Sequence, residues 1–189
     1  MENMKRVYSL IIIATFCMSA VYAQSIFRGK VLKNEEAKMT YIVDENDNGT
    51  LMMEEPAGGG VYLKTEVKGK DYSTKKLMFF EKDFSTMRIV EVRADGGNII
   101  VHSDGYVIYE GMKCDKNTNP KVYDAFSPLI SKLEEKLPEI LSGQENKVKF
   151  QIAYIDDNKM LAPKPSCLER GQLSSSMEYL TFSIEDNVE

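Results

Sequence analysis

The sequence predicts a mostly β (α+β) protein: an antiparallel meander that forms a barrel, half-barrel or sandwich, with one amphipathic helix near residues 120–141. Three observations predict this class. Apolar and polar residues alternate over most of the chain, short turn sequences rich in Gly, Asn and Asp separate the alternating runs, and one late segment changes to a four-residue apolar repeat.

The alternation predicts strands with one face on a core and the other toward water. The clearest period of two lies at 61–68, 148–154 and 179–184. Less regular apolar runs lie at 26–32, 39–43, 50–53, 76–81, 86–92, 98–102 and 106–110.

The connections between these runs have the chemistry of tight turns. They include Asp47-Asn48-Gly49, Asp95-Gly96-Gly97, Ser103-Asp104-Gly105 and Asp156-Asp157-Asn158. Gly, Asn and Asp tolerate the positive φ values that hairpins need. Connections this short join neighbouring strands in antiparallel pairs, because a parallel crossover needs a dozen or more residues.

The helical segment is marked by Leu129, Leu133, Leu137 and Leu141, which recur every four residues. Ser127 suits an N-cap and Pro128 the first helical position. We expect 128–141 to pack Leu129, Leu133, Leu137 and Ile140 on the sheet, with a kink at Pro138 and a shorter helix opened by Asn119-Pro120. The alternative is a stripe that contacts a partner.

Residues 1–23 have the three parts of a secretory signal peptide. Lys5 and Arg6 precede an uncharged apolar run, and Val21 and Ala23 place small residues before the expected cleavage site. An uncleaved anchor is the competing interpretation. The prediction is a signal peptide at 1–23 and a single β-rich domain at 24–189, exported to the periplasm, the cell envelope or the extracellular space.

Net charge argues against nucleic acid as a partner. The formal charge is −5, and removal of the leader, which carries a net +1 from Lys5, Arg6 and Glu2, makes it −6. An acidic chain repels phosphate backbones. No second apolar run follows the leader, so the sequence predicts no transmembrane segment in the mature chain.

Two cysteines remain when Cys17 leaves with the leader. In an oxidising compartment, Cys114 and Cys167 are predicted to form a disulfide. The alternative is a pair of separate buried thiols. One histidine and no close pair of cysteines argue against a zinc site.

One segment matches the calcium-loop pattern D-x-[DN]-x-[DN]-G-x5-E through Asp44, Asn46, Asn48 and Glu55. The loop of that pattern joins two helices. Here the flanking residues, 41–43 and 51–53, alternate like strands. We therefore predict a polar hairpin that binds no calcium, and keep these four residues as the metal-site alternative.

No catalytic residue and no cofactor is assigned. His102, Ser103 and Asp104 are adjacent, so on a strand they point to opposite faces and do not form a triad. The carboxylate pairs Glu54-Glu55 and Asp156-Asp157 lie in or near turns, where solvated acids are common.

Eight candidate strands, a late helix and further strands behind a signal peptide resemble the order of the lipocalins. The chain has no tryptophan, and Phe27-Arg28-Gly29-Lys30-Val31 stands where that family has Gly-x-Trp. Residues 87–92 and 101–109 also look like the half-barrel lipoprotein carriers of the Gram-negative envelope. Either resemblance implies an apolar or lipid-like ligand, and neither assigns a site residue.

Three functions remain open. The first is an exported non-enzymatic protein that binds an apolar small molecule inside a β-barrel. The second is an envelope or surface module with a filled core that binds another protein, and the third is a secreted hydrolase. The interior distinguishes them, because a lined cavity favours the first, a close-packed core the second and a cleft with converging carboxylates the third.

Overall fold

The computed structural model describes residues 24–164 and 177–188, and in this part of the chain the strands form one antiparallel sheet. The early strands are β1 (Lys30–Asn34), β2 (Met39–Val43), β3 (Asn48–Gly58), β4 (Val61–Asp71), β5 (Leu77–Ala94), β6 (Ile99–His102), β7 (Tyr106–Tyr109) and β8 (Met112–Cys114). The helices α2 (Pro120–Phe126), α3 (Pro128–Glu134) and α4 (Leu137–Leu141) follow. The last strands are β9 (Lys147–Gln151), β10 (Tyr154–Ile155), β11 (Lys159–Pro163) and β12 (Tyr179–Asp186).

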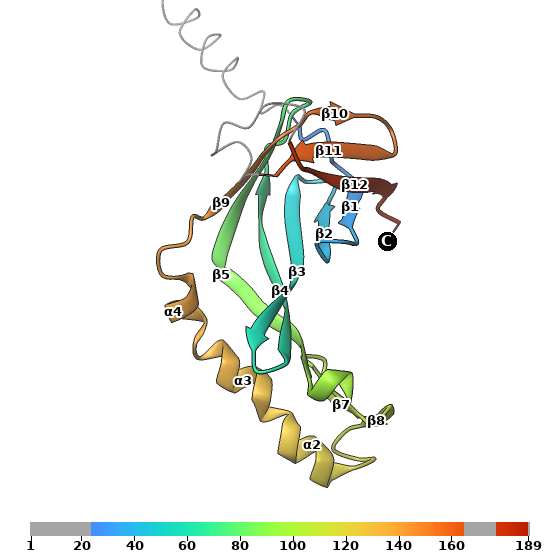
Figure 1. Ribbon diagram of the computed structural model, residues 1–189, viewed down its shortest axis with the longest axis vertical. Helices are drawn as coiled ribbons and strands as arrows, with labels where there is room; N and C mark the ends of the chain where they lie inside the picture. Colours follow the sequence, from blue (N-terminus) through green and yellow to red (C-terminus); the bar gives the residue numbers. More distant parts are fainter. Residues whose placement is uncertain (1–23, 165–176, 189) are drawn as a thin grey trace, which may run out of the picture.

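The strand order is β10-β11-β12-β1-β2-β3-β4-β5-β6-β7-β8, and β9 pairs with β5 beside this path. The predicted antiparallel β class with a late helix is therefore confirmed. The upper half curls into a half-barrel (Figure 1), because the stretch formed by β9 and the two residues after it bonds to both β5 and β11. The Ile152 amide donates to the Lys76 carbonyl, and the next amide, of Ala153, donates to Leu161.

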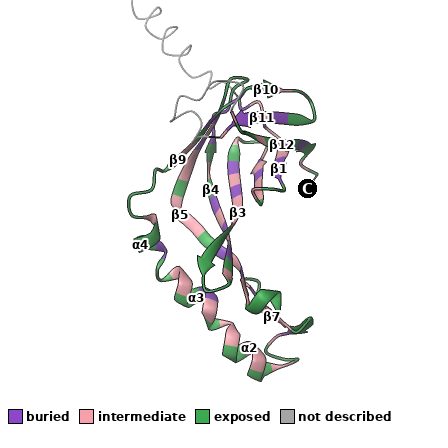
Figure 2. Ribbon diagram, in the orientation of Figure 1, coloured by how far each residue is buried: buried purple, intermediate pink, exposed green. Residues whose placement is uncertain are grey.

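The half-barrel encloses the larger of two hydrophobic clusters (Figure 2). Its largest side chains are bulky and each is at most 1% exposed: Phe27, Leu32, Tyr41, Leu51, Met78, Phe80, Met160 and Phe182. Aromatic rings contact one another across the interior, with centroids 5.0 Å apart for Tyr41 and Phe80. Side chains of this size fill the space between the strands.

Two glycines make room for the Tyr41–Phe80 pair. Gly49 and Gly69 are directly opposed on β3 and β4. A Cβ at Gly49 would collide with the Tyr41 hydroxyl, and one at Gly69 with the Phe80 ring and the Glu81 carbonyl. Glycine at such positions lets another group approach the backbone closely.

A buried carboxylate lies beside these rings at the end of β4. Asp71 is 1% exposed, and its two oxygens accept hydrogen bonds from the hydroxyls of Ser25, Tyr41 and Ser73 and from the Ser73 amide. The Tyr41 bond is 2.6 Å long. Because Ser25 belongs to the segment before β1, this network fixes the start of the described chain to the core.

An ion pair also holds the same segment. Arg28 donates to both oxygens of Asp47, at 3.0 and 2.6 Å, and the Ser25 amide donates to Asp47 at 3.2 Å. The hydrogen bond from Arg28 is the main cause that holds the pKa of Asp47 below its usual value, against the opposing effect of burial.

Stability should therefore decline less steeply in acid when Asp47 is replaced. A carboxylate with a lowered pKa contributes stability above its unfolded pKa of about 3.9, and the contribution is lost as the pH falls through the folded value. Asp47→Asn should cost about 1 kcal/mol at pH 7 and flatten the stability profile below about pH 4. Urea titrations from pH 7 to pH 2 measure both effects. A profile parallel to that of the unmodified protein would contradict the assignment.

The lower half contains the second cluster, between the sheet and the helical segment. It joins β4–β7 to α3 and α4 through Leu63, Ile89, Val92, Val101, Val107, Ile130 and Leu137. The Glu134 carboxylate accepts a hydrogen bond from the Ile89 amide at 3.1 Å. This amide lies between the parts of β5 that pair with β9 and with β6. On its other edge β5 pairs with β4 here, through Ile89 and Thr65, so the helical segment supports the one edge of β5 that neither β9 nor β6 covers at this point.

Two details of the predicted helix are wrong. Ser127 is not an N-cap: it has helical dihedrals and makes no capping bond, because its amide continues the turn by donating to Tyr123. The cap is Asn119, whose side chain accepts from the Val122 amide. Ile140 is 52% exposed instead of packed, and Ile130 takes the buried place. The helix is interrupted between the two residues: α3 ends at Glu134, and α4 begins at Leu137 with Pro138 in its first turn, so the four-residue spacing does not continue to Ile140.

Two strand boundaries also differ from the prediction. The runs at 76–81 and 86–92 form a single strand, β5, whose pairing with β4 shifts between Asp83 and Arg88. The Thr86 hydroxyl bonds to the Lys68 amide within this irregularity. The run at 26–32 becomes a strand only at Lys30, because Phe27 and its neighbours form turns. Within the described residues, no helix has the length and apolar character needed to cross a membrane.

Candidate functional site

The outer face of β4 carries the polar half of its alternating sequence. Leu63, Thr65 and Val67 are buried, so the intervening side chains project to the other face of the sheet. That face runs along β4 through Tyr62, Lys64, Glu66, Lys68, Lys70 and Tyr72. Neither hydrophobic cluster covers it.

The strand register places polar partners beside these residues. Asn48, Lys70, Glu81 and Lys147 are successive partners across β3, β4, β5 and β9. Thr50, Lys68 and Asp83 form the neighbouring row. Acidic, basic and neutral groups are therefore interspersed over a few strands.

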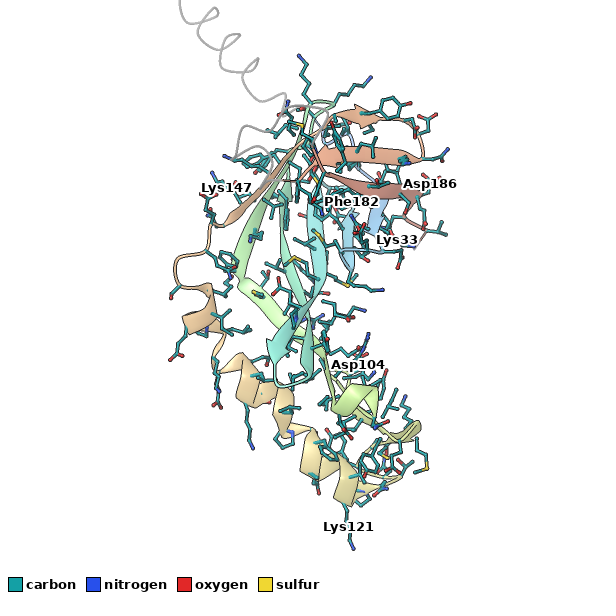
Figure 3. All side chains as sticks on the ribbon, viewed as in Figure 1. Lys33, Asp104, Lys121, Lys147, Phe182 and Asp186 are labelled. Atoms are coloured by element: carbon teal, nitrogen blue, oxygen red, sulfur yellow. The ribbon has the colours of Figure 1, made fainter. Side chains whose placement is uncertain are left out.

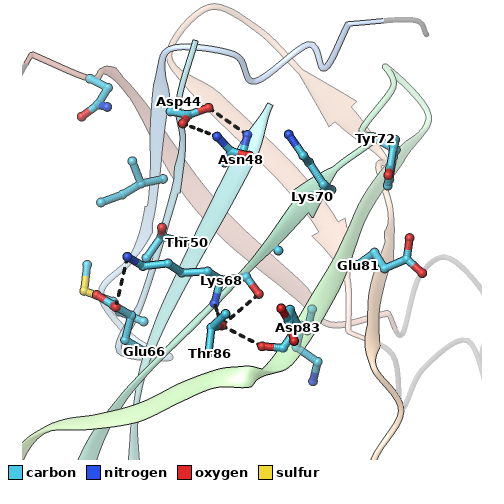
Figure 4. A pocket seen from close by; sticks show the side chains of 15 residues that line it. Asp44, Asn48, Thr50, Glu66, Lys68, Lys70, Tyr72, Glu81, Asp83 and Thr86 are labelled. Atoms are coloured by element: carbon cyan, nitrogen blue, oxygen red, sulfur yellow. Dashed lines mark hydrogen bonds and ion pairs between the residues drawn. The ribbon is translucent and has the colours of Figure 1, made fainter. Parts of the chain in front are cut away.

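The same face is hollowed into a groove of about 820 Å³ between the strands β2–β5 (Figure 4). We call it the outer groove. Its polar lining residues are Asp44, Asn48, Thr50, Glu66, Lys68, Lys70, Tyr72, Glu81, Lys82, Asp83, Thr86 and Asn187, and its apolar ones are Ile42 and Met52, with Gly69 between. A volume of this size lies in the range of small-molecule sites.

The carboxylates of the outer groove are held in place by donors. Asp44 accepts from the amides of Asn46 and Asn48 and from the Asn48 side chain, and Glu66 pairs with Arg88 at 3.0 Å. Burial raises the pKa of Asp44, but the bonds from Asn48 and Asn46 outweigh it and keep that pKa below its usual value. Asp44 is thus a fixed acceptor at neutral pH.

The lysines of the groove are less constrained. Lys70 donates to the Asn46 carbonyl at 3.1 Å, and Lys68 is 3.9 Å from Glu66. An ammonium group has three donors, so each lysine can make further hydrogen bonds. Burial lowers the pKa of Lys82, whose ammonium lies over the Phe84 ring.

An aromatic platform stands at one end of the groove. The Tyr72 ring is 40% exposed and packs against Phe79, with centroids 5.8 Å apart. Lys147 and Lys149 lie over the Phe79 ring at 5.7 and 5.6 Å. Tyr72 is therefore supported from one side and open to a ligand on the other.

The residues of the calcium-loop pattern are not brought together. Asp44, Asn46 and Asn48 form the predicted hairpin between β2 and β3, where the Asp44 carboxylate closes the turn. Glu55 lies on β3 seven residues beyond Asn48, roughly 23 Å along the strand. It cannot complete a loop with the other three. Over 24–164 and 177–188, no three His, Cys, Asp or Glu side chains are placed to hold a metal ion.

His102 lies on the outer face of the lower half, away from the outer groove. Its ring stacks on Tyr106, with centroids 4.2 Å apart, and its Nδ1 is 3.6 Å from Glu91. Ser103 and Asp104 occupy the exposed turn after β6. The three neighbours do not converge on one point, as their alternation predicted.

The remaining sequence candidates are far from one another or lie inside the core. Glu54 pairs with Arg93, and Asp156 accepts from the Asn158 amide in a turn. Asp71, which the sequence did not single out, accepts from the hydroxyls of Ser25, Tyr41 and Ser73 and is closed to solvent. Cys114 is a buried thiol, and its predicted disulfide partner Cys167 lies outside the described residues.

Comparison with known proteins adds no relative: no family model, curated protein or solved structure matches the chain significantly. The resemblances to lipocalins and to half-barrel carriers therefore stay predictions. The functional argument rests on the fold and on the outer groove.

Proposed function

We propose that this protein is an exported, non-enzymatic binding module that recognises its target with the outer face of the sheet. The observation that carries the proposal is the contrast between the two faces of the half-barrel. The inner face is filled by rings such as Tyr41, Phe80 and Phe182, the last of which is labelled in Figure 3, whereas the outer face holds the outer groove (Figure 4).

Among the three functions open from the sequence, this contrast favours the module with a filled core. A ligand inside the half-barrel would have to displace side chains that are at most 1% exposed. An enzyme would need an acid, base or nucleophile free to act. The accessible carboxylates of the outer groove are instead engaged by neighbouring amides, hydroxyls or cations.

Export is part of this proposal. The predicted cleavage site precedes Gln24, and Ser25 and Phe27 are already buried in the half-barrel. Residues of the predicted mature chain are therefore part of the packed fold from its second residue, Ser25, onward. N-terminal sequencing of exported material should begin at Gln24, and retention of Met1 would contradict the prediction.

The filled interior has a direct test. Native mass spectrometry of the mature protein, purified from the exporting cells, should give the mass of the chain alone. A hollow of about 540 Å³ between β5 and the helical segment offers a lipid a place outside the filled interior. It is lined by Phe84, Met87, Leu137, Pro138 and Leu141, and also by the charged residues Arg88 and Glu134. A tightly held lipid in the spectrum would overturn the proposal in favour of an apolar-ligand carrier.

Lysine footprinting locates the binding face. The mature protein is acetylated with and without a concentrated extract of the surface and medium of the source cells. Lys68 and Lys70 should be protected by the extract, whereas Lys121, exposed on α2 in the lower half (Figure 3), should react equally in both samples. Equal reactivity at all three lysines would reject the outer groove as the binding face.

A further inference from the structure

We propose that the ligand of the outer groove is a neutral polyhydroxylated chain, that is, an oligosaccharide. This inference rests on the proposed function and names the class of ligand that the groove fits. It follows from the charge balance of the lining, from the mixture of donors and acceptors, and from the position of Tyr72.

Charge balance argues against a strongly ionic ligand. The lining has three lysines, Lys68, Lys70 and Lys82, and four carboxylates, Asp44, Glu66, Glu81 and Asp83. A polyanion would be repelled by the four carboxylates, and a polycation would be repelled by the three lysines. A neutral ligand avoids both repulsions.

An apolar ligand fits no better. It would displace water from the charged side chains of the groove without replacing the hydrogen bonds that the water makes. The lining offers only Ile42 and Met52 as aliphatic side chains. A ligand must therefore bring its own polar groups to meet the lysines and carboxylates.

Hydroxyl groups meet both needs, since each one donates and accepts. The ammonium groups of Lys68 and Lys70 can donate to a sugar oxygen. The carboxylates of Asp44, Glu81 and Asp83 retain lone pairs beyond the bonds they already accept, because an ionised carboxylate has about four acceptor sites. The Thr50 and Thr86 hydroxyls extend the set along β3 and β5.

Tyr72 supplies the apolar contact that a sugar ring needs. A pyranose has one face of C–H groups, which packs on an exposed aromatic ring. Tyr72 already packs against Phe79, so its ring loses less freedom on binding. Along the outer groove β3 is paired with β2 on one side and with β4 on the other, so an extended peptide gains no backbone bonds from β3.

The test uses soluble polysaccharides as probes. Affinity electrophoresis of the full mature chain is run in gels that contain dextran, laminarin, mannan, xylan, polygalacturonate or poly-glutamate. At least one neutral polysaccharide should retard the protein. Tyr72→Ala should weaken that retardation about tenfold, and Tyr72→Phe should keep most of it.

The matched control is Tyr62→Ala. Tyr62 lies on β4 near its start, whereas Tyr72 directly follows the end of the same strand; Tyr62 is 47% exposed but is not part of the outer groove. This variant should bind like the unmodified protein. An equal loss in Tyr62→Ala and Tyr72→Ala would overturn the placement of the ligand, and circular dichroism of each variant excludes unfolding as the cause.

The remaining outcomes separate this inference from the proposed function. Retardation by polygalacturonate or poly-glutamate alone would overturn the neutral glycan in favour of an acidic ligand. No retardation by any probe, together with protection of Lys68 and Lys70 by the cell extract, would reject the glycan and leave the binding module standing. No retardation and no protection would reject both.

Discussion

Asp71→Ala is expected to lower the free energy of unfolding by about 3–5 kcal/mol, which is a large share of the stability of a typical domain. The substitution removes the acceptor of the hydroxyls of Ser25, Tyr41 and Ser73 at once. Each buried donor left without a partner costs about 1–3 kcal/mol. Urea denaturation at pH 7, followed by circular dichroism, measures the loss.

Tyr41→Phe is the graded comparison, because it removes one donor and keeps the ring against Phe80. It should cost less than Asp71→Ala, about 1.5–3 kcal/mol.

Burial, and then the charge of Asp71, raise the pKa of Tyr41 far above its usual value. A raised pKa gives stability that is complete below the unfolded value of about 10 and is lost as the pH rises above it. Tyr41→Phe should therefore lose less stability between pH 9 and pH 11 than the unmodified protein. If Asp71→Ala costs under about 1 kcal/mol, the network is not a structural anchor.

Leu137→Ala is expected to cost about 2–5 kcal/mol, because Leu137 is 7% exposed and fills the cluster between α4 and the sheet. Ile140, three residues later on the same short helix, is 52% exposed. Ile140→Ala should change the unfolding free energy by no more than about 0.5 kcal/mol. A denaturant titration of the two variants compares a packed and an exposed residue of one element.

This pair also separates two roles of the helical segment. If Leu137→Ala shifted the unfolding midpoint no more than Ile140→Ala, the helix would not belong to the core. The apolar stripe would then serve a partner. Leu133, which the sequence placed in the core stripe, is only half-buried in the structure, so Leu133→Ala should fall between the two variants.

The sequence was informative wherever one local pattern decides the structure. The alternation at 61–68 predicted that Leu63, Thr65 and Val67 face the core, and they do. It failed where an element is interrupted or where a distant partner decides. The helix stripe was extrapolated across Pro138 to Ile140, although α3 ends at Glu134 and α4 begins anew at Leu137. The runs at 76–81 and 86–92 join into the single strand β5 because both pair with the long strand β4. No local sequence pattern reveals this pairing.

The outer groove was missed for a similar reason. The alternation at 61–68 predicted which residues of one strand face outward, but a groove needs the register of four strands. That register is set by pairings between strands, such as Asn48 with Lys70. The only early signal was turn chemistry at Asp44–Gly49, which the calcium pattern explained in another way. Pairing between strands, and not motif content, assembled this surface.

The place of β12 has a consequence for the order in which the chain folds. This strand lies between β1 and β11. One edge of β1 can therefore pair only after residues near 183–186 are present, because Lys30 pairs with Asp186 and Lys33 with Ser183. Closing a loop of this length carries a large entropic cost and slows folding. A chain that emerges with its N-terminus first therefore leaves one edge of β1 unpaired until its C-terminal segment arrives. During that interval the exposed edge is open to association with other chains, and a chaperone that covers it would have most effect at this stage.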